Sequence, residues 1–132
     1  MDEQFSSLRL NLVVLRSKQV EQSVRFYRSL GLSFSKHRHG TGVEHYSSEI
    51  ADLIFEIYPL AEHKSPTTET RLGFVVEDVD VAVSKLLSAG GRVISAPCTS
   101  EWGRRAVVSD PDGHRIELTM SAVTSSGDTS ST

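Results

Sequence analysis

The hydrophobic and polar positions along the chain follow one pattern twice, with a shift of about sixty residues. An apolar run over residues 10–15 is typical of a buried strand, and residues 20–31 follow with apolar positions at helical spacing. Residues 71–76 and 79–90 repeat this strand and helix in the same order. Each half then continues with three short strand-like runs, at 33–37, 43–47 and 53–58 in the first half and at 92–95, 105–108 and 115–120 in the second. The pattern therefore predicts two copies of one β-α-β-β-β unit.

The segments between and beyond these elements indicate how the chain is divided. The stretch PLAEHKSPTTET at residues 59–70 is rich in proline, threonine and charge, which is typical of a surface connection. The motif DPDG at residues 110–113 is a turn signature, because proline presets one turn dihedral and glycine permits a positive one. We expect a single domain over residues 1–132, with a first module at about 8–60, a second at about 70–120 and a disordered polar tail at 121–132.

Composition and charge narrow the class of protein. With 38% hydrophobic and 23% charged residues, the chain has the composition of a globular domain. Its formal net charge is −3 and no stripe gathers the basic residues, so nucleic acid is not an expected partner. No apolar run is long enough for a membrane span, and the first residues lack a signal pattern, so we expect a soluble, cytoplasmic protein. Cys98 is the single cysteine, which excludes an intrachain disulfide.

Four polar residues at matching places in the two halves are candidates for a site. Glu56 and Glu117 interrupt the apolar strands IFEIY and RIELT that end each half, and Asn11 and Arg71 lie in the strands that open each half. Because side chains alternate between the faces of a strand, Glu56 shares a face with Tyr58. If each sheet curls around a shared cavity, the four side chains converge there. The alternative is a structural pair, in which an inward glutamate is simply neutralised by an inward arginine.

Three segments of the chain resemble the vicinal oxygen chelate superfamily, which includes glyoxalase I, bleomycin-resistance proteins and extradiol dioxygenases. They are VVLRSKQVEQSVRFYRSLGL, GFVVEDVDVAVSKLLSAGG and WGRRAVVSDPDGHRIEL, and the resemblance covers residues 8–120. It implies an α+β fold of two tandem βαβββ modules whose curved mixed sheets form a cavity. It also implies a homodimer. It does not fix the function, because one fold carries many activities.

In the metal-dependent members of this superfamily, the resemblance implies a metal held by the first and last strands of the modules, at the positions of Asn11, Glu56, Arg71 and Glu117. Asn11 offers only a weak amide ligand for Zn, Ni or Fe. Arg71 cannot coordinate a cation, because guanidinium stays protonated and has no free lone pair. We therefore expect no metal, with Glu56 and Glu117 as the fallback ligands of a divalent Zn, Ni, Mn or Fe. If the four positions converge, Arg71→His should create divalent-metal affinity.

Further residues are candidates for ligand contact. His45 lies mid-strand beside Tyr46, where one of the two must face the cavity, although core packing is an alternative role for His45. Trp102 lies on the loop before the seventh strand and either covers the pocket or caps the core. His37, His39 and His114 are expected at the surface. We thus assign Glu56 and Glu117 as candidate catalytic residues, and as candidate substrate-binding residues Asn11, Arg71, Tyr58, His45 and Trp102.

These assignments leave three hypotheses for function. In the first, the protein binds a small molecule, anionic or carbonyl-bearing, through donors such as Arg71 and Asn11, with a degenerate metal site. In the second, it is a metal-dependent lyase or isomerase of the glyoxalase type, similar to lactoylglutathione lyase, in which Glu56 or Glu117 serves as the general base. In the third, it is a non-catalytic dimer module. A dioxygenase of the same superfamily is a further enzymatic possibility, and small-molecule binding is the hypothesis we prefer.

Overall fold

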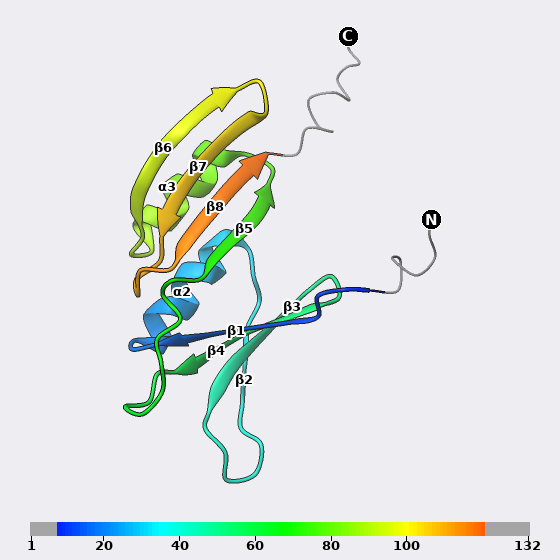
Figure 1. The fold of residues 1–132 in the computed structure, drawn as a ribbon, viewed down its shortest axis with the longest axis vertical. Helices are drawn as coiled ribbons and strands as arrows, with labels where there is room; N and C mark the ends of the chain where they lie inside the picture. Colours follow the sequence, from blue (N-terminus) through cyan, green and yellow to red (C-terminus); the bar gives the residue numbers. More distant parts are fainter. Residues whose placement is uncertain (1–7, 121–132) are drawn as a thin grey trace.

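A computed structural model of the protein describes residues 8–120 and shows two four-stranded sheets, each with one helix (Figure 1). The first module contains β1 (Leu12–Ser17), α2 (Val20–Leu30), β2 (Ser35–His37), β3 (His45–Ile50) and β4 (Leu53–Pro59). The second contains β5 (Arg71–Val76), α3 (Val79–Ser88), β6 (Arg92–Ser100), β7 (Gly103–Ser109) and β8 (Arg115–Met120). The expected α+β class and the repeated β-α-β-β-β order are confirmed. The expected tail at 121–132 lies outside the described residues.

The two sheets have the same topology, which is the structural counterpart of the sequence repeat. Their strand orders are β1-β4-β3-β2 and β5-β8-β7-β6. In each sheet the first and last strands of the module pair in parallel, and the other neighbours are antiparallel. The residues near the ends of each module, Glu56 and Glu117, are therefore held in the middle of their sheets and not at an edge.

Each helix covers one face of its own sheet, and the two helices pack against each other. In the view of Figure 1, α3 lies behind the sheet of the second module. Helix α2 buries Val24 and Tyr27 as the helical spacing predicts, and it ends at Gly31, whose φ of 123° is a conformation that glycine adopts readily. Helix α3 begins at Asp78, whose carboxylate accepts a 3.1 Å hydrogen bond from the backbone N–H of Val81. In the described residues, neither helix is long and apolar enough to cross a membrane.

One hydrophobic core joins the two modules. Its aromatic side chains form a series of edge-on contacts from Phe26 to Tyr27, Tyr27 to Phe55 and Phe55 to Phe74, with ring centroids 4.9, 5.1 and 6.4 Å apart. The last contact crosses from β4 to β5. Because the core takes one face of each sheet, the opposite faces remain for other contacts.

Strand β6 is longer than the sequence pattern predicts. The predicted strand covers residues 92–95, whereas the observed strand continues to Ser100 with two register shifts against β7. The added residues, 96–100, contain Pro97 and few apolar side chains, so the hydrophobic pattern does not predict a strand there. An edge strand tolerates proline and bulges because one of its sides needs no ladder hydrogen bonds.

Candidate functional site

Glu56 lies on the face of the first sheet that points away from helix α2. Its partners across the sheet are Val14 on β1 and Ser47 on β3, and both flanking residues of β4, Phe55 and Ile57, are buried in the core. The carboxylate of Glu56 is largely covered but keeps some contact with solvent. The alternation read from IFEIY is therefore confirmed for this strand.

A row of planar side chains crosses the same face beside Glu56. Arg16 pairs with Tyr58 in the parallel ladder, and His45 pairs with His37 in the antiparallel one. The rings of Tyr58 and His45 stack with centroids 4.1 Å apart and planes 7° apart, and the Arg16 guanidinium lies 5.6 Å from the Tyr58 ring centroid. Glu56, Tyr58 and His45, all named from the sequence, thus form one group, which we call the first half-site.

The second half-site is formed by Glu117 of β8 and two arginines. Arg105 of β7 donates a 2.8 Å hydrogen bond to Oε2 of Glu117, and Arg71 of β5 lies 3.9 Å from Oε1. The hydrogen bond from Arg105, aided by the charge of Arg71, holds the pKa of the Glu117 carboxyl below its usual value. Sequence reasoning missed Arg105, although alternation in the run RRAVV places it on the same face as Val107, the partner of Glu117.

Asn11 requires a correction. Its carbonyl accepts a 2.9 Å hydrogen bond from the N–H of Ile54, which belongs to the first pair of the ladder, Leu12 with Ile54. In that ladder Leu12 and Val14 share the face of Glu56, so Asn11 lies on the opposite face. The sequence reading was wrong here because it placed Asn11 and Glu56 in one cavity without knowing the register between their strands. Asn11 is therefore removed from the candidate site.

The two half-sites belong to separate sheets. Within residues 8–120, no hydrogen bond or ion pair connects the group around Glu56 with the group around Glu117. Trp102, in the turn between β6 and β7, is 85% exposed, so it does not cap the core of this chain. The faces that carry the two half-sites also carry exposed apolar side chains, among them Leu12 on the first and Val75 on the second.

The four positions where the family resemblance implies a metal do not fit one. Asn11 points to the wrong face, and Arg71 has no lone pair for a cation. The carboxylate of Glu117 is already contacted by Arg71 and Arg105, whose positive charges oppose a metal ion there. Two guanidinium groups around one carboxylate instead form a donor-rich surface with one positive charge in excess.

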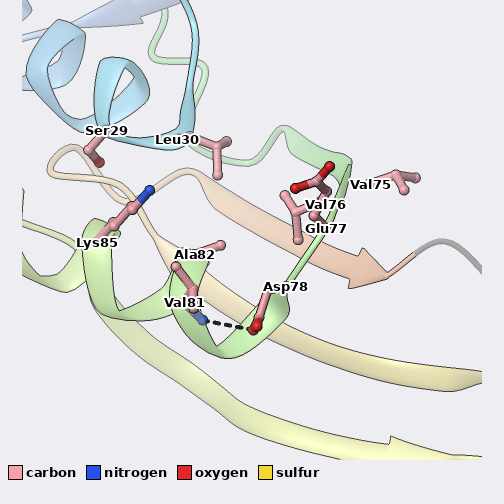
Figure 2. A pocket seen from close by; sticks show the side chains of 9 residues that line it. All are labelled: Ser29, Leu30, Val75, Val76, Glu77, Asp78, Val81, Ala82 and Lys85. Atoms are coloured by element: carbon pink, nitrogen blue, oxygen red, sulfur yellow. Dashed lines mark hydrogen bonds between the residues drawn. The ribbon is translucent and has the colours of Figure 1, made fainter. Parts of the chain in front are cut away.

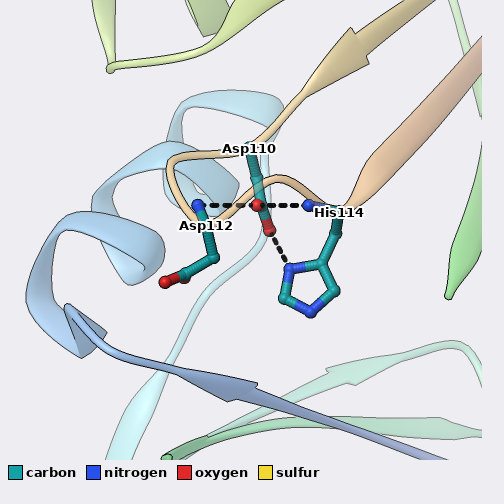
Figure 3. A group of neighbouring side chains, drawn as sticks. All are labelled: Asp110, Asp112 and His114. Atoms are coloured by element: carbon teal, nitrogen blue, oxygen red, sulfur yellow. Dashed lines mark hydrogen bonds and ion pairs between the residues drawn. The ribbon is translucent and has the colours of Figure 1, made fainter. Parts of the chain in front are cut away.

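The DPDG turn forms a buried polar network that the sequence reading did not foresee (Figure 3). Oδ1 of Asp110 accepts hydrogen bonds from the backbone N–H groups of Asp112, Gly113 and His114. Its Oδ2 accepts from the hydroxyl of Tyr27 at 2.6 Å and from Nδ1 of His114 at 2.8 Å. His114 is fully buried, which contradicts the expected surface position, because its ring is hydrogen-bonded to Asp110 and to Thr67.

The same network connects the turn to the first module. Nε2 of His114 and the hydroxyl of Thr67 share a 2.7 Å hydrogen bond, and that hydroxyl accepts from the backbone N–H of Arg16. Asp112 accepts from the Ser17 hydroxyl and from the N–H of Lys18. Burial alone raises the pKa of Asp110, but the hydrogen bonds from His114 and Tyr27 outweigh it and lower the pKa.

Asp110, Asp112 and His114 bring metal-ligating atoms within 4.8 Å of one another. Each of these atoms nevertheless has a hydrogen-bond partner in the protein, so a metal would have to displace several bonds at once. The cluster is therefore best explained as a structural connection between the modules, and we do not assign it to the functional site.

A hollow of about 300 Å³ lies on the helix side of the molecule, between the ends of α2 and β5 and the start of α3 (Figure 2). Leu30, Val76 and Ala82 supply apolar lining, and Lys85 is its basic residue. Asp78 at its rim is engaged in capping α3, and Figure 2 shows Val75 pointing away from the other lining residues. Its polar lining consists of Ser29, Glu77, Asp78 and Lys85. Within residues 8–120 no hydrogen bond or ion pair joins any two of these residues, so we do not assign the hollow as the functional site.

Comparison with known families agrees with this architecture. Residues 9–118 match the model of the Glyoxalase/Bleomycin resistance protein/Dioxygenase superfamily. The match covers most of the chain, and the chain belongs to this superfamily. The superfamily includes metal-dependent members, small-molecule binders and enzymes of several classes, so membership alone assigns no specific activity.

Three proteins are similar to this chain in sequence or in structure. An uncharacterized protein of Mycolicibacterium smegmatis is 29% identical over 108 residues, which is 81% of this chain and 89% of that protein. TnmS3, an antibiotic binding protein from Streptomyces sp. CB03234, has a similar structure with a TM-score of 0.67 and 24% identity, covering 86% of this chain and 95% of TnmS3. A glyoxalase/bleomycin resistance protein from the same organism has a similar structure with a TM-score of 0.64 and 25% identity. The match covers 84% of this chain and 99% of that protein.

Proposed function

We propose that this protein binds a small anionic or carbonyl-bearing molecule, and that Arg71 and Arg105 are its main recognition groups. The observation that carries the proposal is the surroundings of Glu117. One carboxylate faces two guanidinium groups there, which leaves one net positive charge on a solvent-accessible sheet face. Guanidinium N–H groups that are not used by Glu117 suit a carboxylate, a phosphate or a polarised carbonyl oxygen.

The first half-site would supply the other side of the binding site. Tyr58 and His45 offer a flat, stacked surface, and Glu56 offers an acceptor for a hydroxyl or amide of the ligand. Trp102, exposed on its turn, is an additional aromatic group for ligand contact. If the bound molecule is also transformed, Glu56 is the candidate base, because Glu117 is neutralised by arginine.

A second copy of the chain would bring the two half-sites together. Val75, 69% exposed, lies on the face of Glu117, and Leu12, 50% exposed, lies on the face of Glu56. Apolar side chains of this size on two open sheet faces favour association. The proposal therefore includes a homodimer in which the first half-site of one copy faces the second half-site of the other.

The contacts of Glu117 count against the metal-dependent lyase or isomerase hypothesis. That mechanism needs Glu117 as a metal ligand, whereas two arginines contact its carboxylate. Metal analysis of the purified chain distinguishes the two hypotheses, because one equivalent of a divalent ion lost on Glu117→Gln would restore the metal-dependent one.

The binding proposal is tested with a panel of α-keto acids, dicarboxylates and phosphate monoesters, using thermal shift and then calorimetry. We expect one class to bind, and Arg71→Gln and Arg105→Gln to weaken its binding at least tenfold. Arg104→Gln is the matched control, because Arg104 is the neighbouring residue but binds Asp80 on α3 at 2.7 Å. Binding that survives both substitutions, or no binding by any class, would contradict the proposal.

The dimer is tested separately by sedimentation velocity. Val75→Asp should shift the protein toward monomer, whereas Leu87→Asp, at an exposed aliphatic position on helix α3, should not. A monomeric wild-type protein at all concentrations would overturn the dimer while leaving the arginine contacts open to the ligand panel.

A further inference from the structure

Two polar groups of the first half-site face each other without a hydrogen bond between them. Nε2 of His45 lies 3.7 Å from Oε2 of Glu56, which is too far for a direct hydrogen bond. The side chain of His45 is 2% exposed and that of Glu56 is 18% exposed. Within residues 8–120, neither Nε2 of His45 nor the carboxylate of Glu56 has a hydrogen-bond partner. Because covered polar groups in proteins are almost always partnered, we expect a partner from outside the chain.

The ring of His45 presents an acceptor to Glu56. Its Nδ1 lies 3.0 Å from the carbonyl oxygen of Val43, and since a carbonyl can only accept, Nδ1 carries a proton. In the neutral ring the other nitrogen, Nε2, then has a lone pair. The ring of Tyr58 stacks on that of His45 with planes 7° apart, which restricts rotation of the imidazole. Two acceptors therefore face each other, and a donor between them would satisfy both.

The donor that fits between these two atoms has at least two hydrogens and a positive charge. A hydroxyl group has one hydrogen, so it serves only one of the two acceptors. A water molecule serves both, but it leaves the charge of Glu56 uncompensated in a largely covered place. A primary ammonium group has three N–H donors and the opposite charge. Its nitrogen can lie about 2.8–3.0 Å from both acceptors at their observed separation.

The charges on this sheet face favour a cation beside Glu56. Glu49 pairs with Ile54, two residues before Glu56, so a second carboxylate belongs to the same face. Arg16 is on this face too, but the strand order places it beyond Tyr58, with its guanidinium 5.6 Å from the ring centroid. In the described part of the chain, no ion pair joins an arginine or a lysine to Glu56. The carboxylate of Glu56 is therefore available to a cation from outside the chain.

We propose that the first half-site binds a primary ammonium group, which donates one hydrogen bond to Nε2 of His45 and one to the carboxylate of Glu56. Entry of the group needs a rotation of the Glu56 side chain, which is in part open to solvent. In the function proposed above, Arg71 and Arg105 bind an anionic group, so the ligand then carries both charges and is an amino carboxylate. This second step rests on the proposed function, whereas the ammonium contact does not.

The experiment measures calorimetric affinities of the full chain for ω-amino acids of increasing length, from glycine to 6-aminohexanoate. Each is compared with the carboxylic acid of the same length that lacks the amine, and with the alkylamine of the same length that lacks the carboxylate. We expect one length of amino acid to bind at least tenfold more tightly than its acid. Glu56→Gln should remove this difference and leave the affinity for the acid unchanged. His45→Phe should do the same, and it keeps a flat ring against Tyr58 so that the fold is retained.

Glu49→Gln is the matched control, because it removes the same charge from the same sheet face without touching the pair of His45 and Glu56. It should keep the tighter binding of the amino acid. The ammonium contact is overturned if the amine improves binding at no length, or if Glu56→Gln leaves the improvement intact. In either case the affinity for the acids still reports on Arg71 and Arg105. Alkylamines that bind and lose affinity with Glu56→Gln, while no acid binds, would overturn the arginine contacts and support the ammonium contact.

Nitrogen NMR of the His45 imidazole in the free protein at neutral pH provides a second test. We expect a neutral ring with its proton on Nδ1 and a lone pair on Nε2. A doubly protonated ring would overturn the proposal, because Nε2 would then donate to Glu56 and leave no acceptor for the ammonium group. Addition of the amino acid that binds should shift the Nε2 resonance in the wild type and in Glu49→Gln. No shift on saturation would also overturn the proposal.

Discussion

The hydroxyl of Tyr27 in helix α2 donates a 2.6 Å hydrogen bond to Oδ2 of Asp110 in the last hairpin. The two residues are 83 positions apart, and both are buried. Burial, and next the negative charge of Asp110, raises the pKa of Tyr27 well above its usual value. Because Asp110 also organises the backbone of its turn, this one bond connects the first module to the hairpin that carries Glu117.

Tyr27→Phe should lower the free energy of unfolding by about 1.5–3 kcal/mol, the range for a hydrogen bond to a charged group. Loss of the hydroxyl leaves Asp110 with one donor fewer in a place that water does not reach. Tyr46→Phe is the control, because Tyr46 also donates to a carboxylate, that of Glu21, but Glu21 is well exposed. Denaturant titrations should show a larger loss of unfolding free energy for Tyr27→Phe than for Tyr46→Phe. Equal losses would show that the buried bond of Tyr27 contributes no more than the exposed bond of Tyr46.

The raised pKa of Tyr27 predicts a loss of stability in alkali. Above about pH 10 the tyrosine of the unfolded chain ionises, whereas the folded one keeps its proton. The unfolded state then binds fewer protons than the folded state, so stability falls as pH rises through this range. Denaturant midpoints measured between pH 8 and 11 should decline in the wild type. The decline should be smaller in Tyr27→Phe, and parallel declines would assign the effect to other groups.

Asp110 makes stability depend on pH at the acid end of the range, because its pKa is lowered in the folded protein. Its contribution is complete above the pKa of an unfolded aspartate, about 3.9, and is lost as pH falls through the lower folded value. Unfolding followed by circular dichroism from pH 5 to 2 should therefore show an acid transition. Asp110→Asn should be less stable at neutral pH and should show a weaker dependence on acid. An unchanged acid profile would contradict the assignment.

The fold follows from the sequence to a large extent because the repeat is strong in the core-facing positions. Helix α3 buries Val79, Val83 and Leu86, the residues at helical spacing. Strand β1 begins later than expected, at Leu12, and continues through the polar residues Arg16 and Ser17. Hydrophobicity marks the buried face of a strand but not its length, because residues with polar side chains also form the backbone hydrogen bonds of the ladder.

The candidate site could be predicted less completely, and the misplacement of Asn11 shows why. Alternation along one strand is visible in a sequence, but the register between two strands is set by three-dimensional pairing. A shift of one residue moves a side chain to the opposite face, as it does for Asn11 relative to Glu56. Likewise, the burial of His114 depends on Tyr27 and Thr67, which are distant in sequence.

Gly91→Ala should destabilise the protein, because the backbone approaches the core closely at this position. An added Cβ would lie 2.6 Å from a ring carbon of Phe26 and 3.0 Å from the carbonyl oxygen of Leu86. Overpacking of this kind costs about 1–3 kcal/mol. At Gly73 the nearest atom to an added Cβ is 4.0 Å away, so Gly73→Ala should change stability by less than about 0.5 kcal/mol. Thermal melts that rank the two variants equally would contradict this difference.

Arg71→His tests the second half-site through metal affinity. The sequence alone predicts that this change creates a divalent-metal site, but the structure adds Arg105, which remains 2.8 Å from Glu117. We therefore expect Arg71→His by itself to gain no metal affinity in calorimetry. A gain of metal affinity from this single change would show that the hydrogen bond between Arg105 and Glu117 does not prevent metal binding.

Combining Arg71→His with Arg105→Gln should release Glu117 and give a measurable affinity for Zn²⁺. One histidine and one glutamate from the same chain bind such an ion weakly, since stable zinc sites have three or four protein ligands. If a second copy places Glu56 opposite, that carboxylate becomes a third ligand. A further change, Glu56→Gln, should then weaken the new affinity at least tenfold. No effect of Glu56→Gln would argue against the arrangement in which the half-sites of two copies face each other.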